Sequence, residues 1–330
     1  MAGHLVAAAE LSTSPTLIMT NMNAPATLSS AFRGVWPAML TPLQADLSID
    51  HGLYAEHAHA LLAAGCGGVT AFGTTGEGPS FSMAERREAI DALIARGIPA
   101  SQIIVSTSCA ALPETLELTR HATEAGVHGV LMLPPFFLKG VSDRGIADSY
   151  RWVIDRMAGA RLRMYLYHIP QVAAVGLSHA VIRELLDAYP GTIVGIKDSA
   201  CDREHSVGLA QAFMPGITVY VGNETDLPTL GRLGSTGAIS GLANFCPRLV
   251  HRLVMQPDHT GVEDDLAQVR AILQGLDGLS LMPAIKGVMA QRSGQAAWLR
   301  VRPPLVSLDA AQQALLAQRM QAVAGRWAVA

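Results

Sequence analysis

Short apolar segments alternate with longer amphipathic segments along most of the chain. Apolar runs of about four to eight residues are typical of buried strands, and longer stretches with apolar residues at helical spacing are typical of helices. From residue 34 onwards the two patterns take turns eight times. The predicted strands are 34–40, 67–72, 102–106, 129–133, 163–167, 193–197, 218–221 and 237–242. The predicted helices are 51–64, 83–95, 113–125, 144–157, 179–188, 202–213, 226–233 and 247–255.

Repeated strand–helix units predict an α/β protein with a parallel sheet, because parallel strands need a crossover connection and that crossover is right-handed. Eight units that close on themselves form a (β/α)8 TIM barrel, which is the fold that we predict. An open doubly wound sheet is the alternative. It is disfavoured because no G-x-G-x-x-G pattern follows the first strand and no loop has Walker spacing.

Three further helical stretches follow the eighth unit, at 261–275, 281–291 and 308–327. Their amphipathic pattern indicates a helical appendix that packs on the barrel. We therefore divide the chain into a loosely structured N-terminal extension (1–31), a (β/α)8 barrel (32–258) and a C-terminal helical region (259–330).

Composition and charge narrow the classes of function. The chain has 330 residues, of which 50% are hydrophobic and 15% charged, and its formal net charge of −3 gives no basic field for nucleic acid. No apolar run reaches the roughly 18 residues of a membrane helix, and the start of the chain lacks the basic region of a signal peptide. We therefore expect a cytoplasmic protein with no nucleic-acid and no membrane partner.

The cysteines and histidines do not have the spacing of metal ligands. His57 and His59 are two residues apart, so on a helix they would point to different faces. Arg86 and Arg87 lie on a predicted helix, and we expect both in solvent. We expect neither a metal nor a cofactor. The four scattered cysteines, whose spacing suits a reducing cytosol, are Cys66, Cys109, Cys201 and Cys246.

The sixth predicted strand ends in a lysine, Lys197, after the apolar run Ile193–Ile196. Burial disfavours the charged form of a lysine, and a neutral amine can attack a carbonyl group to form a Schiff base. The structural alternative is a lysine that marks the end of the strand and extends to solvent. The rest of the chain favours the catalytic interpretation.

Two other strand ends carry groups that complement an amine. The second strand leads into the loop Gly73–Gly78, whose glycines expose backbone N–H groups and whose Thr74 and Thr75 add hydroxyls suited to a carboxylate. The fifth strand ends in Tyr167, a phenol that can transfer a proton. The loop could be a plain turn, and Tyr167 could fill the barrel. Because function in such barrels lies at the carboxyl ends of strands, their joint placement with Lys197 predicts a site for a 2-oxo acid.

These motifs resemble the dihydrodipicolinate synthase / N-acetylneuraminate lyase family of class I aldolases, and the resemblance extends from about residue 34 to the C-terminal helices. It implies that Lys197 forms the Schiff base, that Tyr167 relays protons, and that Thr74 and Thr75 bind the carboxylate. It also implies a homo-oligomer, either a tetramer or a dimer. The motifs are Gly73-Thr74-Thr75-Gly76-Glu77, Leu166-Tyr167-His168-Ile169-Pro170, Gly195-Ile196-Lys197-Asp198-Ser199 and, in the eighth strand, Gly237-Ala238-Ile239-Ser240.

The chain departs from the synthase pattern at the second-substrate end. Phe136-Phe137 replaces a Tyr-Tyr pair whose second member reaches the neighbouring subunit, and Val172 replaces an arginine that holds the carboxylate of the aldehyde. Met83 and Ala110 stand where synthases bind feedback lysine. The resemblance thus implies a substrate pocket without that carboxylate site. We expect its lining to include Gly73, Phe137, Val172 and Ile239.

Our prediction is a lyase, an aldolase or a dehydratase, that acts on a 2-oxo acid such as pyruvate, a 2-keto-3-deoxy sugar acid or an aryl-substituted pyruvate. One alternative is 4-hydroxy-tetrahydrodipicolinate synthase. The other is a non-catalytic barrel that serves as a sensor or scaffold. Retention of Lys197 and Tyr167 disfavours this last alternative.

Overall fold

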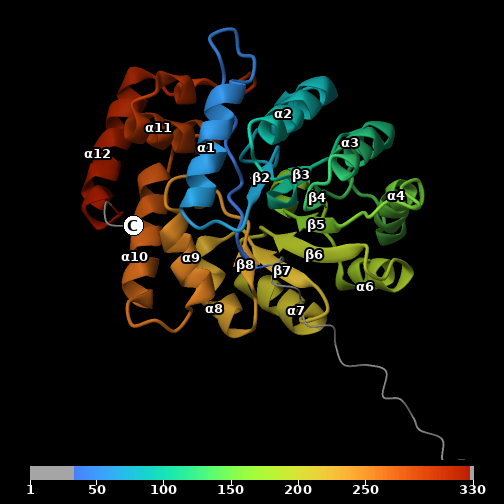
Figure 1. Cartoon of the computed structure of the whole chain (residues 1–330). Helices are drawn as coiled ribbons and strands as arrows, with labels where there is room; N and C mark the ends of the chain where they lie inside the picture. The colour runs from blue at the N-terminus through green and yellow to red at the C-terminus, as the bar shows by residue number, and fades with distance from the viewer. Residues whose placement is uncertain (1–32, 328–330) are drawn as a thin grey trace, which may run out of the picture.

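A computed structural model describes residues 33–327, so the expected extension (1–31) lies outside the described residues. Eight parallel strands form one curled sheet in the order β1-β8-β7-β6-β5-β4-β3-β2 (Figure 1). The prediction of eight parallel strands joined by helices is confirmed. The strands are β1 (Gly34–Val35), β2 (Val69–Ala71), β3 (Ile103–Ser106), β4 (Gly129–Met132), β5 (Met164–His168), β6 (Ile193–Asp198), β7 (Thr218–Val221) and β8 (Gly237–Ala238).

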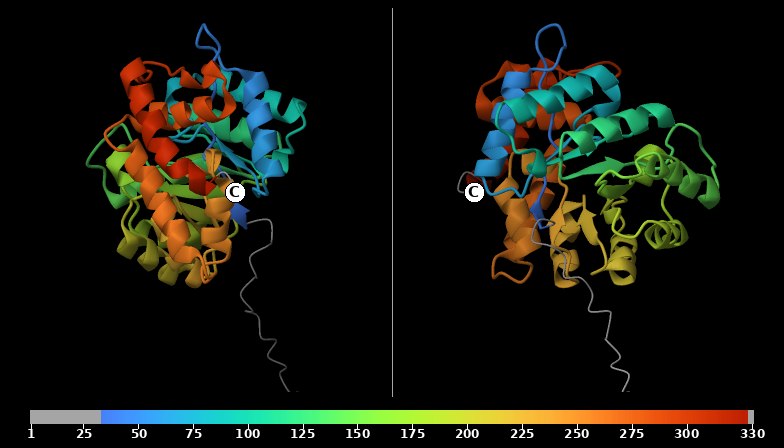
Figure 2. Two further views of the ribbon diagram at one scale, coloured as in Figure 1. Left: turned by 90° about the vertical axis from the view of Figure 1, so that its left-hand side faces the viewer. Right: turned by 45° about the vertical axis from the view of Figure 1, so that its right-hand side comes forward.

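Helices lie around the outside of the curled sheet (Figures 1 and 2). Several begin at the polar caps that their sequences contain: Ser82 forms a full capping box with Glu85, and Ser178 accepts from the backbone of Val181. The helices are α1 (His51–Ala63), α2 (Met83–Ala95), α3 (Leu112–Glu124), α4 (Asp143–Asp155), α5 (Pro170–Ala173), α6 (His179–Ala188), α7 (Arg203–Phe213), α8 (Leu227–Arg232), α9 (Pro247–Met255), α10 (Val262–Leu276), α11 (Leu281–Ser293) and α12 (Ala310–Trp327). Short 3₁₀ turns are η2 (Gly78–Ser80), η3 (Ala100–Gln102), η4 (Glu224–Asp226), η5 (Leu242–Asn244) and η6 (Ala296–Leu299).

The two ends of the sheet meet where the chain continues beyond β1. Ala38 bridges Thr70 of β2 in parallel, and the backbone N–H of Met39 donates to the carbonyl of Thr70 at 2.9 Å. The regular ladder of β1 is shorter than the predicted 34–40, because Pro37 has no N–H to donate to a neighbouring strand.

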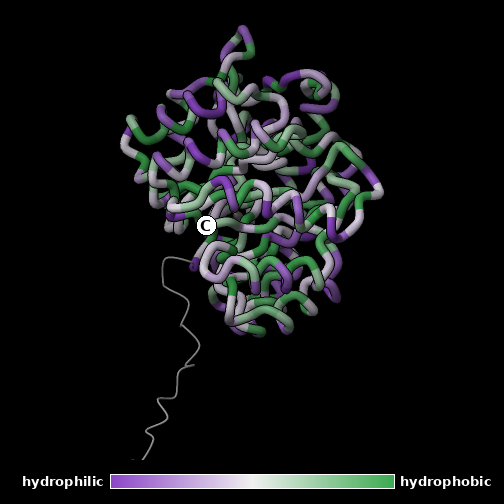
Figure 3. The backbone as a smooth tube through the Cα atoms, turned by 90° about the vertical axis from the view of Figure 1, so that its right-hand side faces the viewer, coloured by the Kyte–Doolittle hydropathy of each residue, from purple (hydrophilic) through white to green (hydrophobic). Residues whose placement is uncertain are grey.

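Apolar side chains fill two layers, one inside the curl of the sheet and one between the sheet and the helices. Along the backbone, hydrophobic and hydrophilic stretches alternate (Figure 3), as expected when fully buried strands are joined by helices that have one face in solvent. The inner layer comprises Trp36, Ala38, Ile104, Leu131, Tyr165, Tyr167, Ile169, Ala173, Tyr220 and Ile239. Among the described residues, no helix has the length and apolar character needed to cross a bilayer.

The last three helices pack on one another beside α9, on one side of the sheet (Figure 2, left). The segment between η6 and α12 then returns to the β1 and β2 side of the molecule. There Arg300 donates to the carbonyl of Leu43, and Arg302 donates to the carbonyls of Leu47 and Ser80. The C-terminal region therefore reaches the loops at the carboxyl ends of the first two strands.

Candidate active site

Lys197 and Tyr167 lie side by side because β5 and β6 pair in parallel with these two residues in register. The side chain of Lys197 is buried, with 4% of the residue exposed, and its Nζ donates to the Tyr167 hydroxyl at 3.2 Å. The same Nζ lies 4.4 Å from the centre of the tyrosine ring. The structure thus joins an amine and a phenol in a buried place, as the sequence predicted.

The loop after β2 brings Thr74 to this pair. Thr74 Oγ1 lies 3.2 Å from the Tyr167 hydroxyl. The loop turns sharply: Phe72 has a φ of 59°, and a Cβ added at Gly78 would lie 2.0 Å from the carbonyl oxygen of Phe72. Only glycine fits there. The side chain of Thr75 lies beside Gly241 in the loop after β8, where its Oγ1 would be 3.5 Å from a Cβ added at Gly241.

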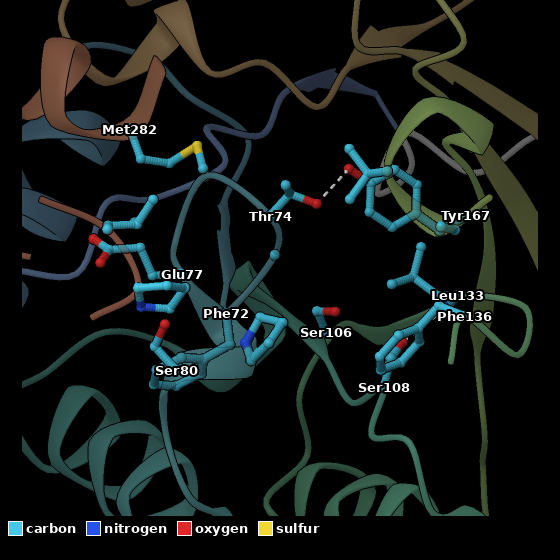
Figure 4. A pocket seen from close by; sticks show the side chains of 16 residues that line it. Phe72, Thr74, Glu77, Ser80, Ser106, Ser108, Leu133, Phe136, Tyr167 and Met282 are labelled. Carbon is cyan, nitrogen blue, oxygen red and sulfur yellow. Dashed lines mark hydrogen bonds between the residues drawn. The ribbon is translucent and has the colours of Figure 1, made fainter. Parts of the chain in front are cut away.

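A cavity of about 250 Å³ opens beside Thr74 and Tyr167. Figure 4 shows Tyr167, Leu133 and Phe136 on one side and Met282 and Glu77 on the other. Its walls are mainly apolar, with three serine hydroxyls among them. The lining residues are Phe72, Gly73, Thr74, Glu77, Pro79, Ser80, Ser106, Ser108, Leu133, Phe136, Tyr167, Val172, Ala173, Met282, Pro304 and Leu305.

The four residues expected in the substrate pocket separate into two groups. Gly73 and Val172 line the cavity, and Val172 is 55% exposed on the one-turn helix α5. Phe137 is outside the lining and 73% exposed, while its neighbour Phe136 faces the cavity. Ile239 is buried in the inner layer of the sheet with Tyr167.

Arg86 corrects the expectation that the Arg86-Arg87 pair is solvated. Arg87 does reach the surface, but Arg86 is 2% exposed and donates to the backbone carbonyls of Ser106 and Ser108, two cavity residues. Burial lowers the pKa of Arg86. The signal was present in the sequence, since Arg86 lies three and four residues before Ala89 and Ile90 on the buried face of α2.

Glu224 is a second residue that the sequence analysis missed. It follows β7 and is buried, where it accepts from the Ser240 hydroxyl at 2.5 Å and from the backbone N–H of Leu242 at 3.3 Å. Burial raises the pKa of Glu224, and these hydrogen bonds together with the nearby Lys197 amine oppose that rise. The carboxylate thus belongs to the electrostatic surroundings of the lysine.

A fully buried ion pair joins the loop after β2 to the C-terminal region. The side chains of Glu77 and Lys286 are both 0% exposed and form a salt bridge. Lys286 Nζ also donates to the carbonyl of Arg300 at 2.7 Å. Burial lowers the pKa of Lys286, and the Glu77 carboxylate opposes this. The carboxylate of Glu77 is therefore neutralised at the wall of the cavity.

On the far side of β5 and β6, His168, Asp198 and His205 form a cluster of groups that could in principle hold a metal ion. Several of their polar atoms already take part in hydrogen bonds. His168 Nδ1 accepts from the backbone of Leu177, and the Asp198 carboxylate accepts from the Ser206 hydroxyl at 2.6 Å and lies 3.1 Å from His205 Nδ1. We interpret the cluster as a hydrogen-bond network that fixes the strands carrying Tyr167 and Lys197.

The fold and the site define an α/β enzyme that acts on small molecules at the carboxyl ends of its parallel strands. The model of the dihydrodipicolinate synthetase family matches residues 31–323. The chain belongs to this family, as its motifs predicted, and it is a lyase.

Three similar proteins illustrate the relationship. An uncharacterised DapA-like lyase of Chloroflexus aurantiacus is 35% identical over 264 residues, which cover 79% of this chain and 87% of the relative. The crystal structure of dihydrodipicolinate synthase from Agrobacterium tumefaciens matches this structure with a TM-score of 0.83 and 30% sequence identity. The match covers 88% of this chain and 99% of the synthase chain. The structure of YagE, a prophage protein of the same family from E. coli K12 in complex with pyruvate, matches with a TM-score of 0.82 and 25% sequence identity. This match covers 89% of this chain and 99% of the YagE chain.

Proposed function

We propose that this protein is a closed (β/α)8 barrel, followed by a C-terminal helical region, that forms a Schiff base between Lys197 and the C2 carbonyl of a 2-oxo acid. The observation that carries the proposal is the buried contact of 3.2 Å between Lys197 Nζ and the Tyr167 hydroxyl. The Ala38–Thr70 bridge between the two ends of the sheet supports closure. The pyruvate in the YagE structure supports the class of substrate.

In this mechanism the neutral amine of Lys197 adds to the C2 carbonyl carbon, and the former carbonyl oxygen takes up protons and leaves as water. The resulting iminium ion accepts the electron pair of the C3–C4 bond when that bond breaks. The C4 hydroxyl loses its proton, an aldehyde leaves, and an enamine remains that takes up a proton at C3. Water then adds to C2 of the resulting iminium ion, and the C–N bond breaks to release pyruvate and the free amine of Lys197. Tyr167 is the group in reach that can carry these protons. Loss of the C4 hydroxyl as water, after removal of a C3 proton, is the dehydratase variant.

The C1 carboxylate of the substrate would lie at the loop after β2. Thr74 offers its hydroxyl there, next to that of Tyr167, and the turn exposes backbone N–H groups. Thr75 is the second carboxylate ligand that we propose.

The group at C4 would be uncharged and largely apolar. Glu77 is the one ionisable carboxylate in the cavity lining, and Lys286 neutralises it. The lining holds no arginine, lysine or histidine. Lys197 lies next to the lining residue Tyr167, 3.2 Å from its hydroxyl, and in this mechanism it is engaged at C2. A second carboxylate on the substrate would therefore have no charged partner. An aryl- or alkyl-substituted pyruvate fits these walls better than a polyhydroxylated sugar acid does. The synthase reaction is the second candidate, favoured by the Agrobacterium relative.

Incubation with pyruvate and sodium borohydride tests the proposal. We expect the mass of one reduced pyruvyl adduct per chain, mapped to a single peptide. The chain has three lysines, Lys139, Lys197 and Lys286, which makes the mapping unambiguous. An adduct on Lys139 or Lys286, or no adduct at all, would contradict the proposal, and the second result would favour a non-catalytic barrel.

We further propose that the protein acts in the cytoplasm as a dimer or tetramer. Its four cysteines are free thiols, which suits a reducing compartment. Phe137 and Leu138 expose apolar side chains next to each other, as expected of residues that a second subunit covers.

A further inference from the structure

One wall of the cavity comes from the end of the chain. Met282 of α11 and Pro304 and Leu305, which lie between η6 and α12, line it together with the loop after β2. Figure 4 shows Met282 on the side opposite Tyr167, Leu133 and Phe136. We call residues 300–305 the C-terminal strap. The strap covers a part of the cavity that the strands bearing Lys197 and Tyr167 do not form.

The strap is fastened by its arginines. Arg302 forms a salt bridge with Glu85 of α2 and donates to the carbonyls of Leu47 and Ser80. The hydrogen bond from Arg302 lowers the pKa of Glu85 to about 2. The Arg300 guanidinium donates to the carbonyl of Leu43, and the backbone carbonyl of Arg300 accepts from Lys286, which is itself paired with Glu77. These contacts fix the backbone just before Pro304 and Leu305.

The side chains that the strap presents to the cavity carry no polar atom. Pro304 and Leu305 offer only hydrocarbon, and Met282 adds a thioether. On the opposite side Leu133 and Phe136 are apolar as well. A substrate group between these two walls would be excluded from water on both faces, which favours apolar groups and disfavours hydroxylated ones.

We infer that the C-terminal strap determines specificity: Leu305, with Pro304 and Met282, selects a bulky, uncharged, apolar substituent at C4 of the 2-oxo acid. In the synthetic direction the matching partner is an aromatic or branched aldehyde. This inference rests on the proposed Schiff-base function. The role of Leu305 is in positioning and selection, since the strap is fastened to α2 and the loop after β1 and not to β5 or β6.

The test compares aldehydes in condensation with pyruvate, using the full-length protein. Wild type should have a higher kcat/KM for benzaldehyde than for acetaldehyde or glyceraldehyde. Leu305→Ala should lower kcat/KM for benzaldehyde by about tenfold or more, mainly through KM, because a lost methylene contact in an apolar pocket has an effect of that size. Its kcat/KM for acetaldehyde should fall much less.

Val306→Ala is the matched control, because Val306 is next in sequence and 78% exposed, and it should leave the ratio of the two aldehydes unchanged. Leu305→Phe is the second variant, and it should shift preference toward acetaldehyde by filling space. Melting temperatures show whether each variant is folded.

The outcomes separate the inference from the function on which it rests. Absence of borohydride trapping in wild type would remove the proposed function. Normal trapping with an unchanged aldehyde ratio in folded Leu305→Ala and Leu305→Phe would overturn the role of the strap. Preference of wild type for glyceraldehyde over benzaldehyde would overturn the apolar substrate class.

Discussion

At the scale of single residues, the chemistry depends on two neighbours across one pair of strands. Side chains alternate between the two faces of a strand, so residues 167 and 197 share the inner face while His168 and Asp198 share the outer one. A slip of one residue in the pairing of β5 with β6 would separate amine and phenol. The outer face also links the two strands, because the His168 ring of β5 stacks on the His205 ring at 4.2 Å and His205 lies 3.1 Å from the Asp198 carboxylate of β6.

Lys197→Ala is expected to abolish reductive trapping by pyruvate while the protein stays folded, because the substitution removes the nucleophile and a buried amine together. Mass spectrometry after borohydride measures the adduct, and circular dichroism measures the fold. Trapping at the wild-type level in this variant would assign the nucleophile to another residue.

Tyr167→Phe is expected to lower kcat by about 10²–10⁴-fold, the usual contribution of general acid–base catalysis. The ring keeps its volume, so packing in the inner layer should survive. Steady-state kinetics on the identified substrate measures the effect, with the unfolding midpoint as control. Unchanged turnover would make the tyrosine a structural residue.

At the scale of elements, the hydrophobic pattern predicted which segments form helices and strands, but it predicted the residues at which they end less well. The ranges of α2, α6 and α9 match the predictions, because caps such as Ser82 mark them in the sequence. β2 ends at Ala71, before the predicted 72, because Phe72 turns into the left-handed region. The short helix α5, which carries Val172, was not predicted, since one turn leaves no periodic pattern.

The candidate site was predictable only where it follows strand ends. Contacts join Tyr167 to Lys197 and to Thr74, as expected, because parallel strands bring their carboxyl ends together. Lys286 and Leu305 could not be placed, because their contacts join segments far apart in the chain and depend on how the last helices pack. No local pattern encodes that packing.

The buried Glu77–Lys286 pair leads to a prediction about stability. Glu77→Gln should reduce the free energy of unfolding by about 3–5 kcal/mol, because it leaves the Lys286 charge buried without a partner. The double variant Glu77→Gln, Lys286→Met should recover most of that loss. Urea unfolding of the single and double variants measures the coupling. If the free energy of unfolding fell equally in the single and double variants, the buried Lys286 charge would not need the Glu77 carboxylate as its partner.

At the scale of the whole molecule, the apolar cavity leads to a prediction about the synthase reaction. We expect poor turnover of pyruvate with aspartate semialdehyde and no inhibition by lysine. Losing a charge-assisted hydrogen bond to a carboxylate removes about 1.5–3 kcal/mol. Val172→Arg, which adds a cation at the cavity, should raise this turnover roughly ten- to a hundred-fold. Wild-type kcat/KM near 10⁴ M⁻¹s⁻¹ in this reaction, a value in the ordinary enzyme range, would speak for a synthase.

Global stability should depend on pH through His57. This residue is buried and bonded to Asn244 at 2.9 Å, and burial lowers the pKa of His57 from 6.5 to about 4. Between these values the unfolded chain binds a proton that the folded chain does not. The free energy of unfolding should therefore fall as pH decreases from 6.5 to 4, by up to about 3 kcal/mol from this group. His57→Gln should reduce the slope of the profile measured by urea unfolding, with the remainder coming from His128, whose pKa burial also lowers to about 4. An unchanged slope would exclude a contribution from His57.

The strap also bears on when the enzyme becomes active during its synthesis. Arg302 and the Ser80 carbonyl that it binds are 222 residues apart in the chain, so the two sides of one cavity wall leave the ribosome at very different times. A nascent chain whose eight strands have been made contains Lys197 and Tyr167 but lacks Leu305 and the arginine that fastens the loop after β2. The wall that we propose to select the aldehyde is therefore completed only after the residues of the proposed Schiff-base chemistry are all present. Selectivity would be the last property that this protein acquires as it is made.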